Sequence, residues 1–180
     1  MPNTESHHTA ALAKRRAAAE RYKPAQVNAL FIAEAPPCDE QRYFYFADVA
    51  DKDSLWVELT KLLYADSFGA TSDERKAKHD WLRRFRDDGY YLIDSVETSQ
   101  LPQGKARQRL IQSNAQRLIA ASEALKPGRI ILIKATVYDG LYAALRQAGL
   151  PVIDCRIPFP GSGQQRKFRV EMQRALDSAS

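Results

Sequence analysis

The chain has 180 residues, of which 44% are hydrophobic, enough for one globular domain with its own core. No apolar run approaches the roughly 18–20 residues of a membrane-spanning helix, and the polar N-terminus lacks a secretion signal. We therefore expect a cytoplasmic protein with no membrane partner. The formal net charge of +5 excludes a strongly acidic chain. Because this excess is moderate, the positions of the basic residues are more informative than their number.

Four stretches hold most of the basic residues: Lys14–Arg21, Arg75–Arg86, Lys105–Arg117 and Arg156–Arg174. Clusters of this kind would attract a phosphate backbone by counterion release. Solvated helix faces are the alternative explanation of the same clusters.

The two cysteines, Cys38 and Cys155, lack the CxxC spacing of a zinc ribbon or an iron–sulfur cluster. We expect two reduced thiols, no metal and no cofactor.

Residues 1–24 are predicted to form a separate segment, in which a polar leader precedes a helix over Thr9–Tyr22 that Pro24 ends. A single α/β domain is expected over residues 25–180. It begins with the short apolar run Asn28–Ala33, which is typical of a buried strand.

Two helices are predicted next. The first is capped by Asp53 or Ser54 and has leucines at helical spacing, at positions 55, 59, 62 and 63. The second is capped by Thr71 or Ser72, continues through Phe85 and ends at Gly89.

Strands and helices then alternate. The predicted order is strand Tyr90–Ile93, helix Arg107–Leu125, strand Arg129–Lys134, helix Tyr138–Gln147, strand Leu150–Asp154 and helix Gln164–Leu176. Helical crossovers of this length imply parallel strands that are covered on both faces. The predicted fold class is α/β, a three-layer α/β/α sandwich with a mostly parallel four-stranded central sheet.

Ligands of such folds bind outside the carboxyl ends of the strands, so three loops define the predicted site: Glu34–Tyr43, Asp94–Gly104 and Arg156–Gly163. The first loop surrounds a double proline with acidic side chains and leads to aromatic ones. The third contains Gly161 and Gly163 and opens onto a helix N-terminus, a favourable place for an anion. The loops together indicate carboxylates, an aromatic platform and a phosphate-binding segment.

The first loop, AEAPPCDE (residues 33–40), resembles the GEAPGxxE motif of the thermostable branch of the uracil-DNA glycosylase superfamily. The segment YYLIDSV (residues 90–96) resembles the superfamily's second strand, where Asp94 stands near the position of a uracil-reading Asn. IPFPGSGQQ (residues 157–165) stands where these enzymes carry an HPSP-like loop. The three elements occur in the same order, each after a predicted strand.

This resemblance implies removal of uracil or a related deaminated base from DNA by hydrolysis of the N-glycosidic bond. Such a catalyst needs a carboxylate, donors for the departing base, a flipped base and an aromatic ring to stack on it. The candidate catalytic residues are Glu34, Glu40 and Asp94. The candidate base-stacking or base-recognition residues are Tyr43, Phe44 and Asp94. The candidate DNA-binding residues are Pro158, Phe159, Gly161, Ser162, Gly163, Arg166 and Lys167.

The sequence also departs from the superfamily. Ile157 replaces the histidine that stabilises the leaving base, Ala35 replaces the residue that manages water in other branches, and the iron–sulfur cysteines are absent. A carboxylate at Asp94 suits an exocyclic amine better than a carbonyl, because an ionised acid only accepts hydrogen bonds.

Other interpretations remain open. Glu34 fits an ion pair with an arginine such as Arg42, Asp94 fits a turn cap, and Tyr43 and Phe44 fit the core equally well. At the level of the protein, the alternatives are a nucleic-acid or nucleobase-binding module that has lost catalysis and, more distantly, an α/β enzyme for a phosphorylated metabolite.

Overall fold

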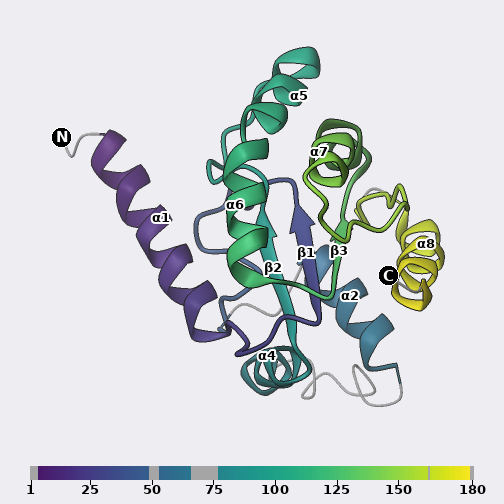
Figure 1. Cartoon of the computed structure of the whole chain (residues 1–180). Helices are drawn as coiled ribbons and strands as arrows, with labels where there is room; N and C mark the ends of the chain where they lie inside the picture. Colours follow the sequence, from purple (N-terminus) through teal and green to yellow (C-terminus); the bar gives the residue numbers. More distant parts are fainter. Residues whose placement is uncertain (1–3, 49–52, 66–76, 162, 179–180) are drawn as a thin grey trace.

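The computed structural model describes residues 4–48, 53–65, 77–161 and 163–178, with side chains described from residue 9 onward. The predicted caps Thr71 and Ser72 and the site candidate Ser162 lie outside the described residues. Within them the chain is a mixed α/β structure with a parallel sheet (Figure 1). No helix in the described ranges is both long and apolar enough to cross a bilayer.

The sheet has three strands among the described residues, in the order β2-β1-β3. They are β1 (Ala29–Ala33), β2 (Tyr90–Asp94) and β3 (Arg129–Leu132), close to their predicted positions. Every residue of β1 is buried, because the strand pairs in parallel on both edges and is covered on both faces. The central strand therefore reads in the sequence as an unbroken apolar run.

The predicted fourth strand is wrong. Residues 150–157 pair with β3 and the residue after it through the isolated parallel bridges Ile130↔Val152 and Ile133↔Ile157. Pro151 has no N–H to donate, and the N–H groups of Val152 and Cys155 donate to carbonyls two residues earlier, at 2.8 and 2.9 Å. Ile153 N still donates to Ile130 O at 2.9 Å, but with the neighbouring donors used locally the segment forms no continuous ladder.

The first half of the chain supplies the helices α1 (Thr4–Arg21), α2 (Ser54–Leu63) and α4 (Lys78–Asp87). Helix α1 begins at Thr4, five residues before the predicted start at Thr9. It lies alongside the β2 edge in Figure 1 and is fixed there by buried Arg15 and by Tyr22, which stacks on Tyr45. Asp53 caps α2 as predicted, accepting from Trp56 N at 3.0 Å.

The helix predicted over Arg107–Leu125 is two helices, α5 (Gly104–Ser113) and α6 (Ala115–Leu125). Asn114 separates them, with φ and ψ of −89° and 0°, and its side-chain amide donates to Leu110 O at 2.9 Å. Helices α7 (Ala135–Gln147) and α8 (Gln165–Asp177) follow the predicted order.

The outer edge of β2 is closed by a tyrosine hydroxyl. Tyr45 is fully buried, and its hydroxyl accepts from Leu92 N at 2.7 Å and donates to Leu92 O at 3.0 Å. Both main-chain groups of an edge-strand residue are thus satisfied without another strand.

We expect Tyr45→Phe to lower the free energy of unfolding by roughly 2–3 kcal/mol, because two buried main-chain groups lose their partner. Urea unfolding measures the change. Tyr142→Phe is the matched control: Tyr142 stacks on Tyr138, and its hydroxyl makes no hydrogen bond to another described residue. Equal effects of the two substitutions would contradict the role assigned to Tyr45.

Candidate functional site

The carboxyl ends of the three strands bring together residues that are far apart in the sequence. Ala33 pairs with Asp94 in the parallel register, so Glu34 follows β1 beside the end of β2. The turn is fixed by main-chain contacts, with Ser95 N donating to Ala33 O at 2.7 Å and Val96 N to Glu34 O at 3.0 Å. On the other side, Lys134 follows β3 and begins α7.

A partly enclosed pocket of about 150 Å³ lies at this edge of the sheet. Five of the predicted site residues line it: Glu34, Tyr43, Phe44, Asp94 and Phe159. Lys134, Asp53 and the apolar side chains of Leu55 and Leu92 complete much of the wall. Its size matches engineered protein cavities of about 150 Å³ that accommodate a single benzene ring.

Glu34 is almost buried, and its carboxylate is held on both oxygens. Thr136 Oγ1 donates to Oε1 at 2.7 Å, and Lys134 Nζ donates to Oε2. Arg107 Nη1 lies 3.8 Å from the same Oε2. The cationic partners of Glu34 are therefore Lys134 and Arg107 rather than Arg42.

Lys134 is a site residue that the sequence reasoning missed. Its backbone has φ +89° and ψ 136°, a conformation that residues other than glycine rarely adopt and that costs about 1–3 kcal/mol. The main chain is held there by the hydrogen bond from Lys134 N to Ile157 O, 2.9 Å long. The ammonium lies at the pocket wall, 5.9 Å from the centroid of the Phe159 ring. The missed signal was its position at the carboxyl end of the third predicted strand.

Asp94 is half-buried at the pocket wall, and its carboxyl group makes no hydrogen bond to another described residue. The turn-cap interpretation therefore lacks the contact it needs. Burial raises the pKa of Asp94 to about 7, against the opposing effect of the cationic Arg15 and Arg117. At neutral pH the carboxyl group is present in both its neutral and its ionised form.

The aromatic residues of the first loop belong to the core and to the pocket at once. Phe44 is buried and packs edge-on against Tyr45 and Trp56, with ring centroids 5.0 and 5.3 Å apart. Tyr43 is buried likewise, and both rings still contribute to the pocket wall. This packing fixes the orientation of the rings before any ligand arrives.

The third loop contributes Phe159, whose side chain remains 38% exposed although it lines the pocket. Pro158 beside it is buried. Gly161 lies under the Phe159 ring, where an added Cβ would approach Phe159 Cε1 to 3.0 Å. Gly163 has φ +79°, and the α8 residues Arg166 and Lys167 are exposed and do not line the pocket.

Two positions that the sequence singled out lie away from the pocket. Glu40 is exposed and is not part of its wall, because the chain turns outward after Pro37. The catalytic role predicted for Glu40 therefore has no support in the geometry. Ile157 is 0% exposed and packs in the core, so a donor for the pocket has to come from elsewhere.

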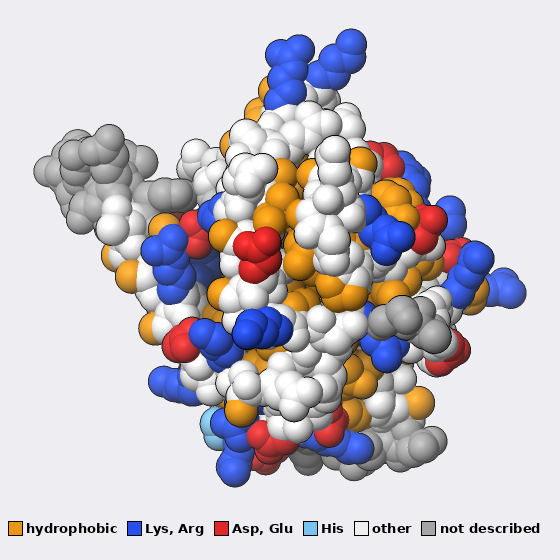
Figure 2. Space-filling model, in the orientation of Figure 1, with side chains coloured by type: hydrophobic (Ala, Val, Ile, Leu, Met, Phe, Trp, Pro, Cys, Tyr) orange, Lys and Arg blue, Asp and Glu red, His pale blue; other side chains and the backbone are white. Residues whose placement is uncertain are grey.

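Basic side chains do not form one continuous stripe on the face shown in Figure 2, where blue Lys and Arg side chains alternate with red Asp and Glu. Apolar side chains show between the helices in the middle of that face. The charge distribution on this face fits solvated helix surfaces.

Comparison with family models, curated proteins and solved structures yields no match to this chain. The chemistry of the pocket is therefore inferred from its own residues.

The raised pKa of Asp94 makes the free energy of unfolding depend on pH, and it also sets the direction of that dependence. The folded protein keeps a proton that the unfolded chain releases near pH 3.8, so the free energy of unfolding falls as the pH rises from about 4 to 7. We expect Asp94→Asn to be more stable than the wild type by about 1–2 kcal/mol at pH 8 and nearly equal at pH 4, after discounting for solvent contact.

Urea unfolding across this pH range measures the difference. Glu123→Gln, which removes a carboxyl group from an exposed position of α6, is the matched control for the substitution itself. A constant difference between Asp94→Asn and the wild type at all pH values would show that Asp94 titrates normally.

Proposed function

We propose that the chain is a nucleobase-releasing DNA glycosylase of the uracil-DNA glycosylase superfamily type, acting on uracil or a related deaminated base. The observation that carries the proposal is the convergence of Glu34, Phe44, Asp94 and Phe159, from three strand-end loops, on one ring-sized pocket. These are the loops on which the sequence resemblance rests.

The fold proposed with this function is a three-layer α/β/α sandwich. Helices α5, α6 and α7 contact one another on one side, and α7 contacts β3. Helices α2 and α8 contact each other, and α4 contacts β2. We assign the first group to one face of the sheet and the second to the other.

The pocket suits a planar base in shape and in polarity. The buried Phe44 ring offers an aromatic surface for stacking, and Leu55 and Leu92 exclude water around it. Asp94 then contacts the polar edge of the base. In its neutral form it donates to a carbonyl such as those of uracil, and in its ionised form it accepts from an exocyclic amine.

Lys134 supplies the cation that Ile157 does not. When the bond between C1′ and the base nitrogen breaks, its electron pair leaves with the base. Water forms the new bond to C1′, and the proton that it loses passes to the departing base anion. An ammonium group at the pocket wall stabilises the negative charge that develops on the base. Glu34 Oε2 accepts a hydrogen bond from this ammonium group. Thr136 donates to Oε1 of the same carboxylate and so holds Glu34 in the orientation that positions Lys134. The strained backbone at Lys134 is consistent with a functional constraint on its side chain.

DNA contacts are assigned to the third loop and the start of α8. Phe159, which is exposed, is proposed to act as an apolar wedge beside the flipped nucleotide. The backbone N–H groups of Gly161 and Gly163 and the side chains of Arg166 and Lys167 are the proposed phosphate contacts. Pro158 is buried and has no N–H, so its proposed part is to hold the loop in place.

A binding module without turnover is the second candidate, and the engagement of Glu34 favours it. With both carboxylate oxygens already occupied by Lys134 and Thr136, Glu34 has limited capacity to orient an attacking water. In that case the pocket would bind a base or nucleic acid, and no abasic product would form.

A base-release assay separates the two candidates. The protein is incubated with single- and double-stranded oligonucleotides that contain uracil, hypoxanthine or xanthine, and abasic sites are then cleaved by alkali. A glycosylase produces cleavage above that of an unmodified oligonucleotide. Salt-dependent DNA binding without cleavage on any substrate would favour the binding module.

We expect Lys134→Met to reduce the rate of base release by about a hundred- to a thousandfold, the typical effect of losing an electrostatic donor. Lys23→Met is the control. Lys23 is exposed just after α1, its Nζ lies 3.4 Å from Glu20 Oε1, and it does not line the first pocket. Single-turnover kinetics on the preferred substrate measure both rates. Equal rates for Lys134→Met and the wild type would exclude Lys134 from the chemistry.

A further inference from the structure

A second pocket, of about 290 Å³, lies between α1 and the β2 edge. It shares Pro36, Tyr43, Leu92 and Asp94 with the first pocket, so the two adjoin across this wall. Its remaining wall is rich in arginine, whereas the first pocket is mainly apolar. Nothing in the proposed function uses it.

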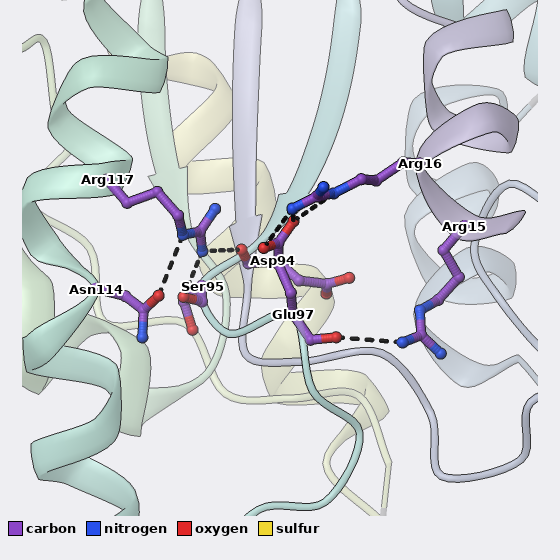
Figure 3. A network of polar contacts seen from close by, with 7 residues as sticks. All are labelled: Arg15, Arg16, Asp94, Ser95, Glu97, Asn114 and Arg117. Carbon is purple, nitrogen blue, oxygen red and sulfur yellow. Dashed lines mark hydrogen bonds and ion pairs between the residues drawn. The ribbon is translucent and has the colours of Figure 1, made fainter. Parts of the chain in front are cut away.

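Arg15 is the most informative residue of this second pocket. The residue is only 4% exposed, although it carries a full positive charge. Its one hydrogen bond to a described residue runs from Nη2 to Glu97 O, at 3.2 Å (Figure 3). The donors on Nε and Nη1 are therefore available to a ligand, and a guanidinium group with unused donors in a pocket favours an oxyanion.

The other two arginines approach from opposite sides of the same segment, Arg16 from α1 and Arg117 from α6 (Figure 3). Arg16 binds the Glu97 carboxylate with two hydrogen bonds of 2.9 and 3.0 Å. Arg117 is anchored to the main chain, donating to Asp94 O at 3.1 Å and to Ser95 O at 2.7 Å. These contacts fix three cations around the pocket, whose acidic residues are Glu20, Glu97 and Asp94.

We propose that this second pocket binds a phosphate group, either as free phosphate or as the phosphate of a nucleotide, with Arg15 as the principal ligand. A tetrahedral oxyanion accepts hydrogen bonds from the unused donors of Arg15 and is attracted by Arg16 and Arg117. The proposal does not depend on base release, because it concerns a different pocket and requires no turnover.

The shared wall makes the two pockets interdependent. In its neutral form Asp94 donates a hydrogen bond to a bound oxyanion, whereas in its ionised form it repels one. We therefore expect anion binding to strengthen as the pH falls through about 7. The charged and titratable groups around Asp94 are Arg15, Arg16, Glu20, Tyr43, Asp53, Tyr91, Glu97 and Arg117, with Glu34 and Lys134 in the adjoining pocket.

Isothermal titration calorimetry with inorganic phosphate, uridine and uridine 5′-monophosphate tests the proposal on the full chain. We expect phosphate and the nucleotide to bind, and Arg15→Met to weaken both by about tenfold or more. Arg146→Met, at an exposed position of α7, is the control and should leave both affinities unchanged. Glu97→Gln removes a competing carboxylate and should tighten binding, which keeps the test valid if Arg15→Met does not fold.

Sulfate, whose charge stays constant near neutral pH, is the probe for the pH dependence. Its affinity should rise from about pH 8 to pH 6 in the wild type and stay level in Asp94→Asn. Binding of the nucleotide alone, with the same dependence on Arg15, would support the site and identify a nucleotide as its ligand. No binding of any phosphate at millimolar concentration, or equal losses in Arg15→Met and Arg146→Met, would overturn the proposal whether or not the protein releases a base.

Discussion

The contact of the Glu34 carboxylate with Lys134 and Thr136 is the interaction on which the architecture of the site depends. It joins the end of the central strand β1 to the start of α7, across 100 residues of sequence. Because β1 lies between the other two strands, fixing its end also fixes the loop that carries Tyr43 and Phe44. The strained backbone of Lys134 is maintained by this contact and by its bond to Ile157 O.

Asp94 sets the electrostatics of the same edge. It stands on the wall between an apolar pocket and an arginine-lined one, and burial outweighs the nearby cations in determining its pKa. A carboxyl group that changes protonation near neutral pH alternates between donating and accepting hydrogen bonds. The affinities for the two proposed ligands, a nucleobase and a phosphate group, would both change with the protonation state of Asp94.

Much of the site was predictable because parallel strands align their ends. Apolar runs located β1, β2 and β3, and the strand-end rule brought Glu34, Asp94 and Phe159 together. The same rule applied to β3 would have found Lys134. Other features depended on local interactions that outweigh the periodicity: Pro151 and hydrogen bonds within residues 150–155 limit the predicted fourth strand to isolated bridges, and Asn114 interrupts a helix that has helical periodicity on both sides. The burial of Arg15 against β2 has no signal in the sequence, because alanines and charged residues alternate along α1 without a one-sided apolar stripe.

The central claim is that the first pocket binds a nucleobase, and a methyl-NMR titration with free uracil tests it most directly. The Ala35, Leu55 and Leu92 methyl groups line the pocket, whereas those of Leu145 lie buried in α7. A bound base should shift the pocket methyl signals progressively with concentration and leave the Leu145 signals unchanged, and Phe44→Leu should weaken the effect. Pocket methyl signals that do not move at millimolar uracil, or equal shifts at Leu145, would contradict the account.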